Sequence, residues 1–237
     1  MSWVQNRTPL WRTLIATMFL TAAGSAAANV LVVRSSGPSA RTYPAGRSLP
    51  DNARITLRAN DTIVVLVGNG TRTFRGPGTF SPSGAPAGRQ TAASNEGRRA
   101  RIGAVRSGGL VPEGSTLWHV DVTQSGTFCL ANAGNVMLWR PDASGRGQLT
   151  LSGAGLNRTL DWPAGQATLA WPAGSRVANG GSYTLSMRGV AVPTRITFRT
   201  LASEPADLQA VAAALIANGC QEQLEILVET APDQTAG

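Results

Sequence analysis

The stretch Thr62–Gly76, TIVVLVGNGTRTFRG, carries a complete β-hairpin signal. It begins with an almost wholly apolar run, TIVVLVG, which is typical of a strand covered on both faces. Asn69 and Gly70 follow, and both residue types tolerate the positive φ angles of a tight hairpin turn. The segment TRTFRG returns the chain, and Pro77 ends it. This stretch therefore predicts a mainly β fold.

Other short strand-like segments lie on both sides of the hairpin. Upstream, Val30–Ser35 is rich in β-branched residues, and Ala53–Ala59 alternates apolar with polar residues. Downstream, the candidate strands are Ile102–Gly108, Thr116–Thr123, Gly126–Asn132, Asn135–Pro141, Gly147–Gly153, Asn157–Pro163, Gln166–Pro172, Gly181–Gly189 and Thr194–Leu201. Short strands at such regular spacing are typical of sandwiches and barrels. We predict a small β-module over 29–80 and an immunoglobulin-like or sandwich β-domain over 102–201.

A segment of different composition separates the two predicted β units. Residues 81–101 consist mainly of Ser, Pro, Gly, Ala, Asn and Arg and show no apolar periodicity. Such a segment has too few apolar side chains to offset the entropy of ordering. We predict a flexible loop or linker here.

The C-terminal part changes from strand to helix signals. Ser203 is a candidate N-cap, and apolar residues then recur at helical spacing up to a Gly219 C-cap. A second helix begins at Gln221 and ends before Pro232. We predict a helical hairpin over 203–230, packed on the β units or serving as a protein contact, and a disordered tail over 231–237.

The chain has two cysteines, Cys129 and Cys220. An even number in an exported chain favours one disulfide, although two buried thiols are the alternative. The bond would close a loop of about 90 residues and contribute about 4 kcal/mol. It would also tie the helical hairpin to the second β unit.

Residues 1–28 have the layout of a secretory signal peptide. Arg7 and Arg12 precede an apolar run, Leu14–Ala23, and small residues lead to a cleavage site after Ala28. The alternative is an uncleaved anchor, because Leu14–Val33 has no charge and is long enough to span a bilayer. We expect a periplasmic or secreted protein that contacts a membrane only through this segment.

The basic charge does not indicate a nucleic-acid partner. The formal net charge is +8, yet all 21 basic residues are Arg and none is Lys, which is typical of a GC-rich genome. The arginines are scattered, with Arg98, Arg99 and Arg101 the tightest group. A phosphate-binding face would instead concentrate them on one element.

Catalytic motifs are not recognisable. The only histidine, His119, precedes Asp121 by two residues, so the two share a strand face but diverge. The sequence has no Gly-x-Ser-x-Gly elbow, zinc-ligand set or phosphate loop. Five aspartates near strand ends leave a carboxylate pair for glycoside hydrolysis open: Asp51, Asp61, Asp121, Asp142 and Asp161. We predict no enzymatic activity, no cofactor and no metal.

The letters WPAG occur twice, beginning at Trp162 and at Trp171. In each copy an aromatic residue ends a strand, Pro blocks further pairing and Ala-Gly makes a turn. We interpret the repeat as punctuation, with the rings packed in the core. The alternative is an aromatic platform for sugars that combines Trp118, Trp139, Trp162 and Trp171, so Trp162 and Trp171 are candidate ligand contacts.

The segment Val30–Phe80 resembles the β-rich periplasmic domain of the FecR family. The matching positions are Gly46, Leu49, Ile55, Leu57, Asp61, Ile63, Val65, Leu66, Gly70 and Thr71. The anti-sigma segment and membrane span that precede this domain in FecR regulators are not evident, so iron signalling is not implied. Together with IGAVRSG, LWHVDVTQSGTFC, LWRP and NGCQEQL, the whole chain is similar to a group of exported alphaproteobacterial proteins.

These observations predict a non-catalytic exported envelope protein. The resemblance implies a binding or structural module that contacts an envelope protein or a glycan. The alternative is a carbohydrate-binding or carbohydrate-processing domain that uses surface Trp and dispersed Asp residues. Exposure of Trp162 and Trp171 distinguishes the two hypotheses.

Overall fold

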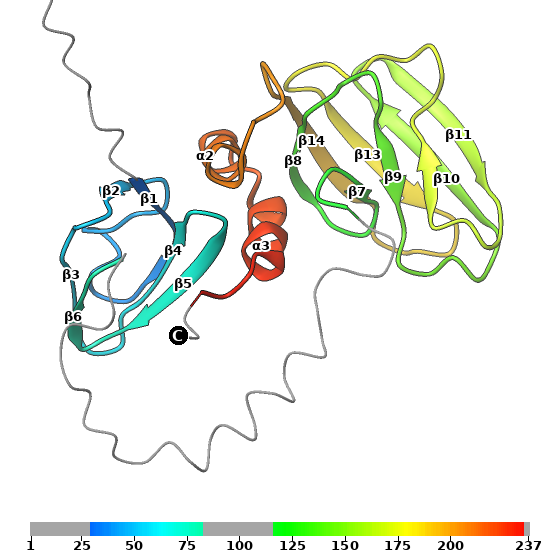
Figure 1. The fold of residues 1–237 in the computed structure, drawn as a ribbon. Coiled ribbons are helices and arrows are strands. Elements are labelled where there is room, and N and C mark those ends of the chain that lie inside the picture. The colour runs from blue at the N-terminus through cyan, green and yellow to red at the C-terminus, as the bar shows by residue number, and fades with distance from the viewer. Residues whose placement is uncertain (1–28, 83–115, 235–237) are drawn as a thin grey trace, which may run out of the picture.

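A computed structural model describes residues 29–82 and 116–234 (Figure 1). The predicted signal peptide, most of the predicted linker and the strand predicted at 102–108 lie outside these residues. The described chain is mainly β with two C-terminal helices, which confirms the predicted fold class. Neither helix, nor any other in the described ranges, is long and apolar enough to span a bilayer.

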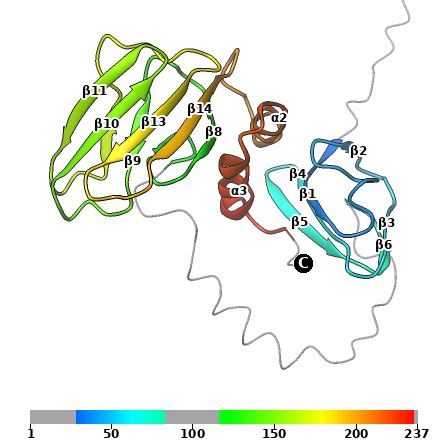
Figure 2. The same ribbon diagram turned by 180° about the vertical axis from the view of Figure 1, so that it is seen from behind.

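The first β-module contains two small sheets. Strands β1 (Asn29–Ser36), β2 (Ser48–Pro50), β4 (Thr62–Val67) and β5 (Gly70–Arg75) form a sheet of order β2-β1-β4-β5. Strands β3 (Ile55–Leu57) and β6 (Gly78–Phe80) pair beside it (Figure 2). A first apolar cluster fills this module: Val30, Val32, Leu49, Ile55, Leu57, Ile63, Val65 and Phe80.

The β4–β5 hairpin forms as predicted, but its turn lies one residue earlier. Val67 pairs with Gly70, so Gly68 and Asn69 make the turn. Only Gly68 has a positive φ, 57°, which is the pattern of a type II′ turn. Gly70 is the first residue of β5 and does not form the turn. A glycine is needed there because a Cβ would lie 2.5 Å from the carbonyl oxygen of Pro232.

Asp61, at the start of this hairpin, is buried and organises the loops around it. Its Oδ1 accepts a hydrogen bond from the Ser39 amide at 2.8 Å, and its Oδ2 accepts one from the Arg58 amide at 2.5 Å. Burial raises the pKa of Asp61, but the hydrogen bonds from Ser39 and Arg58 outweigh it and leave the pKa below its ordinary value. The ionised carboxylate therefore fixes the approach to β4.

The second β-module is a sandwich of unequal sheets. The larger sheet has the order β11-β10-β13-β14-β8 and consists of β8 (Gly126–Leu130), β10 (Gly147–Gly153), β11 (Leu156–Trp162), β13 (Ser182–Met187) and β14 (Thr194–Thr200). The smaller sheet, β12-β9-β7, consists of β7 (Val120–Asp121), β9 (Met137–Trp139) and β12 (Thr168–Ala170). The strand predicted at Thr116–Thr123 shrinks to β7 because Leu117, Trp118 and Val122 lie in turns.

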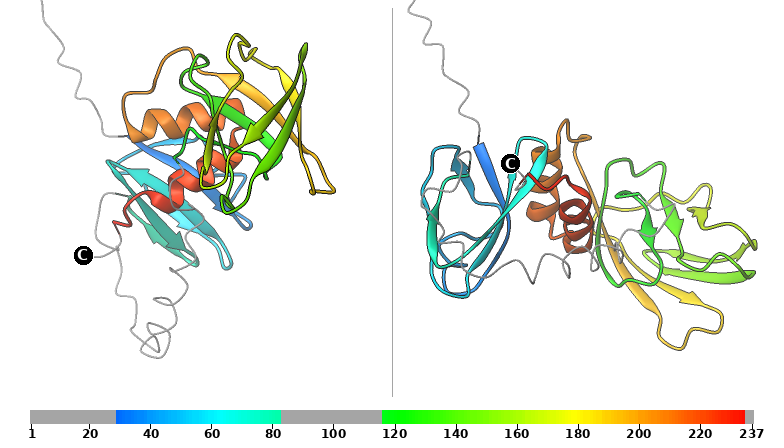
Figure 3. Two further views of the ribbon diagram at one scale, coloured as in Figure 1. Left: turned by 90° about the vertical axis from the view of Figure 1, so that its right-hand side faces the viewer. Right: turned by 60° about the horizontal axis from the view of Figure 1, so that its bottom comes forward.

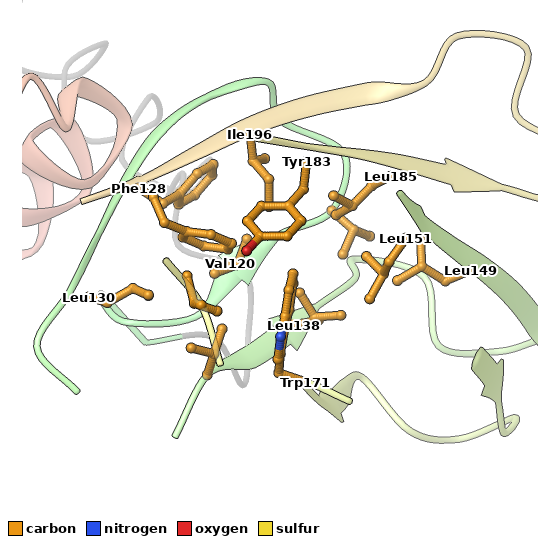
Figure 4. Close-up of a cluster of buried hydrophobic side chains, with 14 of the residues drawn as sticks. Val120, Phe128, Leu130, Leu138, Leu149, Leu151, Trp171, Tyr183, Leu185 and Ile196 are labelled. Atoms are coloured by element: carbon orange, nitrogen blue, oxygen red, sulfur yellow. The ribbon is translucent and has the colours of Figure 1, made fainter. Parts of the chain in front are cut away.

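The sandwich is not a simple meander. Its last strand, β14, returns beside β8 and pairs with it in parallel. The two sheets enclose a second apolar cluster, of which Figure 4 draws most members: Val120, Val122, Phe128, Leu130, Val136, Leu138, Leu149, Leu151, Trp162, Trp171, Val177, Tyr183, Leu185, Ile196 and Phe198.

The two helices are α2 (Leu208–Asn218) and α3 (Gln221–Thr230). The expected N-cap at Ser203 is wrong, because Asp207 accepts a hydrogen bond from the Ala210 amide at 2.8 Å. An Asp carboxylate directly before the first helical residue satisfies an amide that the helix cannot. Gly219 is the left-handed C-cap, as predicted, with φ of 70°.

The helical hairpin lies between the two β-modules (Figures 1 and 3). It shares a third apolar cluster with both of them: Leu31, Val33, Val64, Leu66, Cys129, Ala212, Leu215, Cys220, Leu224, Leu227 and Val228. An Arg34–Glu225 ion pair and a 2.7 Å hydrogen bond from Gln209 Nε2 to the Asn29 carbonyl add polar contacts to the first module. Both modules therefore bury apolar residues against the helical hairpin.

Cys129 of β8 and Cys220 at the start of α3 form a disulfide, as predicted. Beside it, the buried Gln223 side chain pairs with the edge of β8. Its Oε1 accepts from the Cys129 amide at 2.6 Å, and its Nε2 donates to the carbonyls of Cys129 and Leu117 at 3.0 and 2.9 Å. A side chain thus replaces the neighbouring strand that β8 lacks.

The tail predicted to be disordered from residue 231 is ordered as far as Gln234. The Thr71 amide donates to the Pro232 carbonyl at 2.8 Å, and the Gln234 amide donates to the Thr71 carbonyl at 2.9 Å. This segment runs parallel to β5 at its free edge. Backbone pairing holds the tail, which a composition-based prediction does not detect.

Replacing Gln223 tests the pairing at β8. Gln223→Leu fills similar space but leaves the amide and carbonyl of Cys129 without partners, so we expect a loss of about 3 kcal/mol in unfolding free energy. Gln221→Leu, at an exposed position of the same helix, is the control and should change stability by less than about 0.5 kcal/mol. Equal denaturation midpoints for the two variants would contradict this role.

The disulfide makes a separate prediction. Oxidised protein should contain no reactive thiol under denaturing, non-reducing conditions. Cys220→Ala should lower stability by about 2–4 kcal/mol, because the unfolded chain regains loop entropy, and hydrogen exchange should rise first in α2 and α3. Detection of two thiols per denatured chain would refute the bond.

Candidate functional site

The two WPAG segments adopt the same local conformation. Trp162 ends β11 and Trp171 directly follows β12. In each copy the residue after Gly donates its amide to the Pro carbonyl, at 3.4 Å in the first copy and 3.1 Å in the second. Gly165 and Gly174 have φ of 79° and 78°, so both turns have the glycine signature of type II.

Neither indole forms a surface platform. Trp162 is 1% exposed and Trp171 is 9% exposed. Trp171 packs edge-on against Tyr183 and Phe198, with ring centroids 5.1 and 5.5 Å apart (Figure 4). The rings belong to the sandwich core, as the punctuation interpretation predicted. The sugar-platform alternative is wrong for these two rings, because no flat face of either is available.

The first WPAG segment closes one end of the sandwich around a buried arginine. Arg140 is 4% exposed, and its guanidinium lies 4.9 Å from the Trp162 ring centroid. It donates hydrogen bonds to the carbonyls of Gly145, Pro163 and Gln166 at 2.8, 2.9 and 3.2 Å. These carbonyls and the ring face replace water around the charge. Arg140 is thus committed to holding two loops together.

The second WPAG segment forms a wall of a cleft at the opposite end of the sandwich. The cleft has a volume of about 660 Å³. Three parts of the chain line it: Ala133–Val136, Ala170–Val177, and Asn179 with Thr200. The Trp171 amide donates to the Val136 carbonyl at 2.9 Å and so joins the first two parts.

The polar groups of the cleft are suited to binding oxygen acceptors. Arg176 and Asn135 are exposed at its rim. Asn179 accepts a hydrogen bond from the Thr200 amide at 3.1 Å, which orients its side-chain amide. A guanidinium and two side-chain amides share the lining with Trp171, Val136 and Val177, and such a combination of few polar groups with an apolar wall is typical of ligand clefts.

The cleft carries no acid–base machinery. Its lining contains no Asp, Glu, His or Cys. Within the described parts of the chain, no cluster of three or more His, Cys, Asp or Glu residues could hold a metal ion. General acid–base catalysis needs a titratable side chain within hydrogen-bond reach of the reacting group. The described lining therefore offers a ligand hydrogen-bonding groups and an apolar wall.

His119 and Asp121, which the sequence predicts to diverge, form separate local hydrogen bonds. His119 accepts a hydrogen bond from the Thr116 amide at its Nδ1, at 3.1 Å, and burial lowers its pKa. Asp121 accepts instead from the amide and hydroxyl of Thr123 at 2.8 and 2.6 Å. Each residue stabilises its own turn.

Asp142 has a similar local role. It accepts from the hydroxyl and amide of Ser144 at 2.6 and 2.9 Å, and these two hydrogen bonds lower its pKa. Asp161 lies on β11 and accepts from Gln148 Nε2 at 3.4 Å. Neither residue lines the cleft.

The cleft residues Asn135, Arg176 and Asn179 were not predicted as site residues. The available signal was their position in the loops ANAGN and AGSRVANGG, because loops at one end of a sandwich converge. Sequence alone does not show which loops share an end.

Comparison with known proteins finds no matching family model, no matching curated protein and no matching solved structure.

Glycine substitutions test the WPAG turns. Gly165→Ala and Gly174→Ala should each lower stability by about 1–2 kcal/mol, because an L-residue is strained at these positive φ angles although a Cβ would meet no atom. Gly145→Ala, also in open space but without a positive φ, should be neutral or slightly stabilising in thermal denaturation. Equal effects at all three positions would contradict this explanation.

Proposed function

We propose that this protein is a non-catalytic, exported binding module of the cell envelope that engages a protein or glycan partner through the cleft beside Trp171. The observation that carries this proposal is the lining of the cleft, which combines Arg176, Asn135 and Asn179 with an apolar wall and contains no titratable acid–base pair. Such a lining suits recognition by hydrogen bonding and shape.

The scaffold supports a binding role. Thr200 joins β14 to the cleft, and Leu201 donates its amide to the Leu130 carbonyl of β8 at 3.0 Å. β8 is in turn held by the disulfide and by Gln223. A cleft on such a rigid support loses little conformational entropy when it is occupied.

Export is supported by the disulfide and by the layout of residues 1–28. Disulfides persist in oxidising compartments such as the periplasm or the extracellular space. The resemblance of Val30–Phe80 to the FecR periplasmic domain points to the same compartment. The first β-module would then be a second contact surface or a structural support.

A carbohydrate-binding domain is the second candidate; it is favoured by the polar cleft residues Asn135, Arg176 and Asn179, and not by an aromatic platform, because Trp162 and Trp171 are buried. Sugar hydroxyls would hydrogen-bond with Asn135, Asn179 and Arg176. A protein loop offers the same acceptor groups. The two ligand classes share this chemistry and are separated by experiment.

The test compares two double variants of matched composition. Asn135→Ala/Arg176→Ala removes polar groups of the cleft, whereas Asn157→Ala/Arg158→Ala removes the same residue types from exposed positions of β11. For wild type and both variants, we would measure the amount of partner captured by chemical crosslinking in the producing cells and the binding signal on a soluble glycan array.

We expect a partner captured by wild type and by the β11 variant, with at least about tenfold less captured by the cleft variant. A crosslinked polypeptide assigns a protein partner, and a cleft-dependent array signal assigns a glycan. Undiminished capture by the cleft variant would overturn the proposal.

A further inference from the structure

The loop between β13 and β14 presents an apolar tip. Among the described residues, the exposed large hydrophobic side chains are Val190 and Val192, which are 58% and 76% exposed. Ala191 and Pro193 beside them are also exposed. Single exposed apolar residues are common, but a contiguous exposed group marks an interaction site.

The loop connects two paired strands, β13 and β14. Its base is closed by the pairing of Leu185 with Thr194, and the Arg188 amide donates to the Gln148 carbonyl of β10 at 3.0 Å. The Val190 amide donates to the Met187 carbonyl at 3.0 Å. Figure 3 shows this hairpin, in gold, projecting from the sandwich in its right-hand view. The valines are therefore held away from the body of the protein.

Positive charge surrounds the apolar tip. Arg188 and Arg195 flank it and are exposed. Between Asp161 and Glu204 the chain contains no acidic residue, and of the four arginines in this range Arg188 and Arg195 flank the tip, whereas Arg176 and Arg199 lie toward the cleft end of the sandwich. Arg146 is exposed two residues before Gln148, on the neighbouring β10 side, whereas the nearby Asp161 is hydrogen-bonded to the Gln148 side chain. The loop thus has an apolar tip with Arg188 and Arg195 on either side of it.

We propose that the β13–β14 loop docks on an anionic lipid surface. Val190 and Val192 would enter the boundary between headgroups and acyl chains, and Arg188 and Arg195 would lie at the level of the phosphates. An acidic protein surface could neutralise the arginines but would need a matching apolar pocket, whereas a bilayer supplies both environments at the required depths. The charge pattern therefore favours lipid.

This docking would orient the cleft. Strand β14 runs from the loop at Thr194 to the cleft at Thr200, and seven residues in extended conformation span about 20 Å. The cleft would then face away from the bilayer. The lipid contact is independent of the proposed cleft ligand, so either proposal can fail alone.

The test measures binding of the purified chain to vesicles of neutral phosphatidylcholine and to vesicles containing about one-third phosphatidylglycerol. Val190→Ser/Val192→Ser removes the apolar tip, and Arg188→Ala/Arg195→Ala removes the flanking charges. Arg41→Ala/Arg158→Ala, at exposed sites outside the loop, is the charge control. We expect the valine variant to bind anionic vesicles at least about fivefold more weakly. The loop arginine variant should lose about tenfold on anionic vesicles and little on neutral ones.

A second readout reports insertion of the loop itself. Val192→Trp places a fluorophore at the tip, and Thr159→Trp places one on the exposed face of β11. We expect brominated lipids to quench the added emission of the first variant and not of the second, whatever the N-terminal segment contributes to binding. Equal quenching in the two variants, or no quenching in either, would overturn the proposal. Loop-dependent capture of a protein with no quenching would assign the loop to a protein partner and overturn it too.

Discussion

Strand β8 needs hydrogen-bond partners on the side that faces the helices, and this requirement organises the molecule. A backbone amide and carbonyl buried in an apolar interface cost several kcal/mol if they stay unpaired. β8 is the edge strand of its sheet, with β14 on one side and no strand on the side that faces the helices. The Gln223 amide supplies both a donor and an acceptor to Cys129, and the Cys129–Cys220 bond holds the two segments in register. The position of α3, and through it of α2 and the first β-module, follows from this junction.

The parts that were predicted are those encoded by local patterns. The apolar run before Gly68, the left-handed Gly219 and the parity of the cysteines each reflect a constraint within a few residues or a simple count. The errors arose where two local signals competed, as between Asn69-Gly70 and Gly68-Asn69 for the turn, or between Ser203 and Asp207 for the cap. Non-local pairings were beyond the sequence: the parallel return of β14 to β8 and the pairing of Pro232 and Gln234 with Thr71 depend on which edges remain free.

The WPAG repeat shows the limit of a motif. Its two copies share a strand end, a turn type and a buried indole, yet one covers the Arg140 guanidinium and the other borders an open cleft. The difference lies in the partner loops, which are far from the motif in the sequence. The candidate site could not be predicted for this reason: Asn135, Arg176 and Asn179 are ordinary loop residues until the sandwich places them together.

The apolar face of the first β-module is covered by two helices that follow much later in the sequence. Leu31, Val33, Val64 and Leu66 form an apolar face early in the sequence, but α2 and α3, which cover it, follow the whole sandwich in the sequence. During synthesis this face is therefore complete and uncovered while the whole sandwich is still being made. The nascent chain has to be kept from associating with other chains throughout that interval, and premature termination anywhere before α2 would release a product with a permanently exposed sheet. Because the helical hairpin is synthesised after both β-modules, this protein is most prone to aggregation during synthesis and least so once it has folded.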